Sequence, residues 1–369
     1  MEKTWVSIPD VLFFQEGPGV RNTQYTNEGV KLLNVANLVD GKVDLSTTDR
    51  YISEDEAYGK YSHFLCDVGD FIIASSGIKV EYIDKKMGFI DESMLPLCMN
   101  TSTIRFKVLD EKSLNIKYFM YYLKSQHFKG QLAREITGSA QLNYGPSHLK
   151  KMTMPLVDIK LQNDIIQKLD MVQNIIYVRQ KELTMLDELI KARFVELFGD
   201  PITNTKCLDT KELKDVLSLK AGDFTAASDI SDEPSENNIY PCYGGNGIRG
   251  YVAEYNQEGE YSLVGRQGAL SGNVQYAKGK FKNTEHALLV TPIIEMNSIW
   301  LNQLLINLDL KRYQTGAAQP GLSVKNLQEI QIIMVPLAEQ NEFATFVEQV
   351  DKSKFKEKLC YNSFERKNN

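Results

Sequence analysis

The chain contains nearly the same phrase twice: TGSAQLNYGPSHL at residues 137–149 and TGAAQPGLSVKNL at residues 315–327. Five of the thirteen aligned positions are identical, at a constant offset of 178 residues. With this offset kept, the match continues to Gln162-Asn163 and Gln340-Asn341, giving nine identities over the 36 positions from Thr137 to Val172. A repeat of this length indicates two homologous halves within one chain.

The order of expected elements repeats as well. An aromatic and aliphatic helical stretch precedes each phrase, and a proline-containing strand-like run and a helix follow it. Further upstream, SIPDVLFF at 7–14 resembles ELKDVLSL at 212–219, at an offset of 205. The pattern predicts an α+β fold with a pseudo-two-fold internal repeat, in which two homologous mixed α/β domains span residues 1–150 and 202–330.

Two long helices are expected to join these domains, within residues 151–201 and 331–369. Residues 161–198 contain no Gly or Pro, and Gly199-Asp200-Pro201 supplies a stop. Apolar residues recur there with the heptad spacing of a coiled-coil seam. The predicted helix-pairing residues are Ile165, Leu169, Val172, Ile176, Leu183, Leu186 and Ile190 in the first helix and Phe343, Val347 and Val350 in the second.

These helices are expected to pair antiparallel within the chain, and a homodimeric coiled coil is the alternative. Thirty-eight residues at ~1.5 Å each give a rod of roughly 57 Å. At ~3.4 Å per base pair, this length would span at most about 17 base pairs of a duplex.

Composition limits the class of protein. A length of 369 residues suits two or three domains. The sequence shows no signal peptide and no apolar run long enough for a membrane span, so a cytoplasmic protein without membrane contact is expected. The net charge of −6 argues weakly against a nucleic-acid partner, but residues 261–284 carry four positive charges and no negative one.

No motif for an enzyme active site is visible. GNGIRG at 245–250 fits the GxGxxG pattern, but the strand-like YVAEY follows it where a dinucleotide fold needs a helix. The sequence has no phosphate-binding loop, no amino-methyltransferase signature and no nucleophile elbow. Five cysteines without a CxxC pair and four scattered histidines give no metal-ligand spacing. We therefore expect neither catalysis, nor a cofactor, nor a metal.

What remains is binding chemistry in Gly-rich loops. Arginine suits guanine edges, Asn and Gln suit adenine edges, and Lys, Ser and Thr suit phosphate contact. The predicted DNA-binding residues of the second half are Asn246, Arg249, Arg266, Gln267, Ser271, Lys280, Lys282 and Thr284. In the first half they are Ser75, Ser76 and Lys79, and in the repeated phrases Gln141, Asn143 and Gln319, which could instead pin a joint.

Taken together, these features resemble the specificity (S) subunit of type I restriction-modification systems. Two variable globules, each followed by a TGxAQ passage into a long helix, carry the resemblance over essentially the whole chain, and residues 241–290 look like a target-recognition domain of the family. The resemblance implies a non-catalytic DNA-binding subunit whose two target-recognition domains each read half of a bipartite double-stranded site. It also implies that the helices set the spacing and dock two methyltransferase (M) subunits, with restriction (R) subunits joining that complex.

Some features depart from the family pattern: the first half lacks the GRQGAL wording of residues 265–270. Two other classes of protein stay open at this point. A coiled-coil adaptor would show no salt-dependent affinity for DNA, and a nuclease in its own right would act on DNA without partners.

Overall fold

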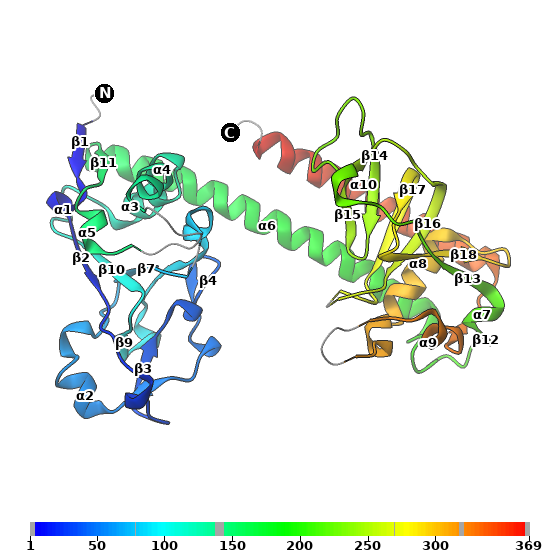
Figure 1. The fold of residues 1–369 in the computed structure, drawn as a ribbon, viewed down its shortest axis with the longest axis horizontal. Coiled ribbons are helices and arrows are strands. Elements are labelled where there is room, and N and C mark those ends of the chain that lie inside the picture. The colour runs from blue at the N-terminus through cyan, green and yellow to red at the C-terminus, as the bar shows by residue number, and fades with distance from the viewer. Residues whose placement is uncertain (1–3, 78, 137–143, 269, 317–320, 366–369) are drawn as a thin grey trace. The chain divides into compact units, whose positions relative to one another are not determined.

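A computed structural model of the chain describes residues 4–77, 79–136, 144–268, 270–316 and 321–365, with side chains up to residue 355. The chain divides into two compact units, Met1–Asn174 and Ile175–Asn369. Helix α6 (Ile159–Phe198) begins in the first unit and ends in the second (Figure 1).

Each unit contains a sheet with the same order of strands. In the first unit the order is β2 (Leu12–Glu16), β10 (Thr103–Val108), β7 (Phe71–Ala74) and β8 (Met87–Phe89). In the second unit it is β13 (Leu217–Ala221), β18 (Ala287–Pro292), β16 (Gln257–Gly265), β17 (Val274–Asn283), β14 (Tyr240–Gly244) and β15 (Gly247–Val252). Neighbouring strands are antiparallel, except that β14 and β17 are parallel.

The flanking elements correspond too. A two-stranded sheet closes each unit, β1 (Thr4–Ser7) with β11 (Thr153–Leu156) and β12 (Thr210–Glu212) with β19 (Gln331–Ile333). The equivalent helices are α1 (Ile8–Val11) and α7 (Leu213–Val216), α3 (Ile116–Leu123) and α8 (Ser298–Asn307), and α5 (Pro146–Leu149) and α9 (Val324–Gln328). The expected α+β fold with an internal repeat is confirmed.

The two units differ in what is inserted into this shared frame. The first unit adds a sheet of β6 (Tyr51–Ile52), β3 (Val30–Leu33) and β9 (Leu97–Met99), the hairpin β4 (Leu38–Val39) and β5 (Lys42–Val43), and helices α2 (Glu54–Tyr58) and α4 (Gln126–Glu135). The second unit adds the β14–β15 hairpin to the edge of its sheet. GNGIRG therefore forms a β-hairpin turn and the strand after it.

Aromatic side chains fill the core beneath each sheet. In the first unit Phe71 of β7 lies opposite Phe106 of β10, and Phe119 of α3 packs on Phe106 with ring centroids 5.0 Å apart. In the second unit Phe198 of α6 packs against Trp300 of α8, with ring centroids 6.1 Å apart. Because each such ring removes a large apolar area from water, these clusters anchor the helices to the sheets.

The first long helix ends where the sequence predicts. Helix α6 stops at Phe198, and Gly199 adopts a φ of +76° while its N–H donates to Val195 O at 2.8 Å. A residue with a side chain would be strained in this left-handed conformation, so glycine is the natural residue after the helix.

The second long helix, α10 (Leu337–Glu365), packs antiparallel on the C-terminal part of α6 inside the second unit. The ring centroids of Phe194 and Phe343 lie 5.5 Å apart, and Lys354 Nζ forms an ion pair with Asp187 Oδ1 at 2.6 Å. The residue number on α10 rises from 343 to 354 while that of its partner on α6 falls from 194 to 187. This arrangement confirms the expected antiparallel pairing within the chain.

The two ends of the predicted seam belong to different cores. Ile190 and its partners Phe343, Val347 and Val350 are buried in the core of the second unit, with Leu186 against them. Ile165 instead packs on the core of the first unit, beside the buried Ile166, and Leu169 is 36% exposed. An ideal helix drifts by about 20° per heptad from a 3.5-residue repeat, so one seam cannot serve both ends.

The middle of the seam consists of Val172, Ile176 and Leu183, which are half-buried. Their pairing with the second helix stays a prediction.

Candidate nucleic-acid interface

Two loops of the second unit meet at one end of its sheet. These are the β14–β15 turn at Gly245-Asn246 and the β16–β17 connection, residues 266–273. Gly265 lies so close to Gly245 that a Cβ on it would come within 2.3 Å of the Gly245 carbonyl oxygen, and Asn273 Nδ2 donates to Asn246 Oδ1 at 2.6 Å. Glycine is required here because the two backbones touch.

This contact brings the predicted base-reading residues of the two loops together. Asn246, Arg249 and Gln267 are exposed, and Arg266 is half-buried. The Arg266 Nη1 donates to Glu285 O at 3.2 Å, while its buried Nε has no hydrogen-bond partner in the described part of the chain. The hydrogen bond to Glu285 therefore orients the guanidinium and leaves other N–H groups of Arg266 without a partner. Recognition of a guanine edge needs such donors.

Three predicted contact residues are buried and face inward. Ser271 and Thr284 are fully buried, and the Thr284 hydroxyl donates to Tyr243 O at 2.8 Å. Ser75 is 1% exposed, and its hydroxyl donates to Glu16 Oε1 at 3.3 Å. The structure thus corrects the expectation of direct contact, because all three hydroxyls are buried. Those of Thr284 and Ser75 bond internal groups, and that of Ser271 has no hydrogen-bond partner in the described part of the chain.

The lysines of β17 are neutralised by carboxylates of neighbouring strands and loops. Lys280 lies 4.0 Å from Glu258, and Lys282 lies 3.5 Å from Asp223 with only 19% of its side chain exposed. A hydrogen bond from Asn256, followed by the nearby Lys282, holds the pKa of Asp223 below its usual range. A phosphate would have to displace these partners, so Lys280 and Lys282 are weaker candidates than their sequence context implies.

The corresponding loop of the first unit begins in the same geometry. Gly77 and Gly268 have φ values of +75° and +78°. The carbonyl of Ser75 accepts from Tyr144 N at 2.9 Å, and that of Arg266 accepts from Leu322 N at 2.8 Å. Tyr144 and Leu322 are 178 residues apart, within the repeated phrases. A residue near the middle of each phrase therefore holds the start of the equivalent loop in place.

The other predicted residues of these phrases, Gln141, Asn143 and Gln319, lie outside the described residues. Ser76 is half-buried and Lys79 is exposed on the loop of the first unit.

A second duplicated contact was missed in the sequence. Gln162 Oε1 accepts from Asn115 N at 2.9 Å, and Gln340 Oε1 accepts from Asn297 N at 2.9 Å. The amide of each Gln also donates to a carbonyl at the start of its long helix, Val157 O or Val335 O. We call these two contacts the glutamine clamps. The repeated Gln-Asn pair was the available signal.

Metal chemistry gains no support: the described residues contain no group of three or more His, Cys, Asp or Glu side chains that could hold an ion. Nor is any helix of this part of the chain both long and apolar enough to cross a bilayer.

Comparison with known proteins identifies the family. Residues 16–186 and 207–359 match the model of the type I restriction modification DNA specificity domain, and the chain belongs to this family. It is 42% identical over 141 residues to the type I restriction enzyme EcoprrI specificity subunit of Escherichia coli, which is 38% of this chain and 35% of that subunit. It is 24% identical over 190 residues to the MjaVIII specificity subunit of Methanocaldococcus jannaschii, 50% of this chain and 43% of that one. These matches span less than half the length of either relative.

Solved structures show the same fold. The S subunit of a type I restriction-modification system from M. genitalium aligns with a TM-score of 0.57 at 18% identity, over 98% of this chain and 92% of that one. A chain from a structure of a type I R-M system, described for its complex assembly and conformational transition, aligns with a TM-score of 0.53 at 15% identity, over 99% and 94%.

Proposed function

We propose that the chain is the non-catalytic specificity subunit of a type I restriction-modification complex. Each unit binds one half of a bipartite site in double-stranded DNA. The long helices α6 and α10 set the distance between the halves and dock two methyltransferase subunits. Restriction subunits join the complex, and the assembly works in the cytoplasm.

One observation carries this proposal: both units present an equivalent loop, started by the same hydrogen bond from donors, Tyr144 N and Leu322 N, that are 178 residues apart. Ser75 and Arg266 occupy the same position in this geometry but differ in chemistry. A shared scaffold with different loop residues suits two surfaces that read different sequences. The contact residues that we propose are Asn246, Arg249, Arg266 and Gln267 in the second unit and Ser76 and Lys79 in the first.

Reconstitution with a methyltransferase subunit tests the proposal. We expect the mixture to methylate an interrupted DNA sequence, and neither protein to do so alone. Sequencing that maps modified bases after treatment of genomic DNA is the measurement. Methylation at a continuous, single-part site would contradict the assignment of one half-site to each unit.

The same preparation separates the two alternatives. A coiled-coil adaptor would leave DNA affinity independent of salt, whereas phosphate contacts make binding fall as salt rises. A nuclease would cut DNA in the absence of any partner.

A further inference from the structure

The loop between β7 and β8 is longer than its equivalent in the second unit. It comprises twelve residues, 75–86, against eight, 266–273, between β16 and β17. Both loops start from the same hydrogen-bonded position and the same left-handed glycine. The first unit has Ser75-Ser76 where the second has Arg266-Gln267, and the additional length is wound into the short 3₁₀ helix Val80–Lys85.

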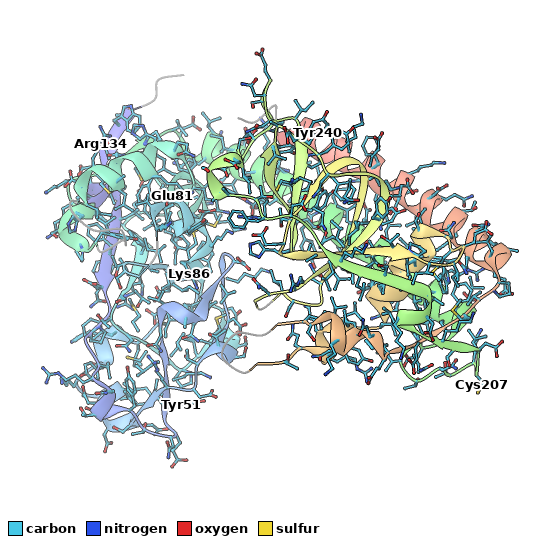
Figure 2. The ribbon with its side chains drawn as sticks, turned by 45° about the vertical axis from the view of Figure 1, so that its right-hand side comes forward. Tyr51, Glu81, Lys86, Arg134, Cys207 and Tyr240 are labelled. Atoms are coloured by element: carbon cyan, nitrogen blue, oxygen red, sulfur yellow. The ribbon has the colours of Figure 1, made fainter. Side chains whose placement is uncertain are left out.

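The additional residues line a surface depression of about 480 Å³ together with the β4–β5 hairpin. Its walls include Gly77, Lys79, Tyr82, Lys85 and Lys86. Tyr82 is 51% exposed, and Lys85 Nζ lies 5.4 Å from the centre of its ring. The Gly41 N–H of the hairpin donates to Lys85 O at 3.1 Å, which places the exposed Lys42 beside this wall. Figure 2 labels Glu81, within the 3₁₀ helix, and Lys86, directly after it.

We name this set the lysine rim: Lys42, Lys79, Lys85 and Lys86. Within the described part of the chain, none of the four pairs with a carboxylate, although Asp40 and Glu81 lie in the same segments. Five other lysines of the same unit do have carboxylate partners: Lys31, Lys107, Lys117, Lys129 and Lys151. The lysines of β17 in the second unit are paired as well.

Unpaired ammonium groups around a half-exposed aromatic ring fit the sugar-phosphate backbone of duplex DNA. Each lysine supplies a flexible point charge with three donors, which suits phosphate oxygens and does not by itself read base edges. An apolar partner would have to desolvate these charges, and an acidic peptide would not explain why the rim continues the loop equivalent to Arg266-Gln267.

We propose that the lysine rim is the DNA-backbone contact of the first unit. This inference rests on the proposed function and adds residues that the sequence did not single out. The second unit approaches DNA through Arg266 and the residues beside it. The first unit, which has serine at the equivalent position, adds phosphate contacts from the longer loop to hold its half-site.

The test compares two double variants of the full chain. Lys79→Ala with Lys85→Ala removes two exposed rim lysines, one of which lies over a tyrosine. The matched control is Lys60→Ala with Lys112→Ala, also two exposed lysines of the first unit, with Lys60 Nζ 4.8 Å from the centre of the Tyr61 ring. Affinity for a labelled random-sequence duplex is measured across a salt series by fluorescence anisotropy, with the chain alone and with its methyltransferase partner.

Each lost phosphate contact should lower the slope of log K against log salt by about 0.9, so the rim variant should lose about 1.8. The control should keep the wild-type slope, and both variants should unfold at the wild-type temperature. A rim variant with the slope of the control overturns the inference and leaves the proposed function standing. A wild-type chain whose DNA binding does not depend on salt overturns both.

Discussion

At the scale of single residues, Arg266 is the strongest candidate for reading a base. Its backbone is fixed by hydrogen bonds to His286 and Leu322, and one guanidinium nitrogen is held by Glu285 O. We predict that Arg266→Ala costs about 1–3 kcal/mol of discrimination at one position of one half-site, because a bidentate contact to a base edge is lost. Maps of methylated sites would show that position becoming degenerate.

Arg266→Lys separates base reading from charge. It keeps the positive charge but loses the planar fork, so it should show the same degenerate position with nearly the wild-type salt dependence. Lys220→Ala removes one exposed charge from the same unit and should leave the maps unchanged. Uniform loss of methylation over all sequences in Arg266→Ala would reassign this residue to phosphate contact.

The first unit contains a buried ion pair. Asp70 is 2% exposed and lies 3.3 Å from Arg105, whose guanidinium also donates to Leu65 O and His63 O. We predict that Asp70→Asn lowers the free energy of unfolding by about 3–5 kcal/mol, because the buried guanidinium loses its carboxylate partner. Urea denaturation of the full chain measures this change.

A surface pair gives the comparison for that measurement. Asp49, with 83% of its side chain exposed, lies 3.4 Å from Lys31, and Asp49→Asn should cost no more than about 1 kcal/mol. Asp70 also lies 3.2 Å from Lys107. If both variants lose the same free energy of unfolding, neither this second contact nor the burial of Asp70 contributes to stability.

At the scale of elements, the glutamine clamps join each helix α3 or α8 to the first turn of a long helix. Gln340 is 2% exposed and bonds both Asn297 N and Val335 O. We predict that Gln340→Leu lowers the free energy of unfolding by about 2–5 kcal/mol. It leaves the buried Val335 carbonyl and the partly buried Asn297 N–H unpaired, and a fully buried group costs about 1–3 kcal/mol. The unfolding transition of the second unit, followed by fluorescence of Trp300, reports it.

Asn341 is the matched control for the clamp. It accepts from Asn297 Nδ2 at 2.8 Å but is exposed, so water can replace it and Asn341→Ala should cost well under the buried change. Equal losses in the two variants would mean that the helix contact depends on general packing and not on the clamp.

The sequence predicts the bounds of helices better than it predicts which strands lie side by side in a sheet. The 38-residue run without Gly or Pro and the stop at Gly199 define α6 almost to the residue, because helix signals are local. The order of strands in the two sheets could not be inferred, since alternation shows that a strand has two faces but not which strand lies beside it. The repeat supplied what local signals lacked, because it required both units to share one order.

The candidate site was predictable in its chemistry but not in its exposure. Arg266, Gln267 and Asn246 lie in loops as expected, at one end of the sheet, whereas Arg249 lies in strand β15 and not in a loop. Ser271 and Thr284 carry the same kind of hydroxyl as a phosphate-binding residue, yet both are buried, and the Thr284 hydroxyl bonds the internal carbonyl of Tyr243. Burial is set by contacts between loops distant in sequence, which no local pattern records.

At the scale of the whole molecule, α6 is the element that links the two units, and its forty residues at ~1.5 Å give a rod of about 60 Å. If the helix sets the distance between half-sites, a change in its length must change the number of base pairs between the two half-sites. We predict that four residues inserted after Gln180, in the exposed middle of α6, lengthen the spacer of the methylated sequence by about two base pairs, since roughly one turn adds ~6 Å against ~3.4 Å per base pair.

The half-sites themselves should not change, because the inserted residues touch neither loop. An insertion of the same length in the exposed segment 232–237 of the second unit is the control, and it should leave the spacer at its wild-type value. Each unit alone should bind weakly, and the helix raises the effective concentration of the second half-site for the second unit. A longer helix with an unchanged spacer would therefore overturn the assignment of this distance to α6.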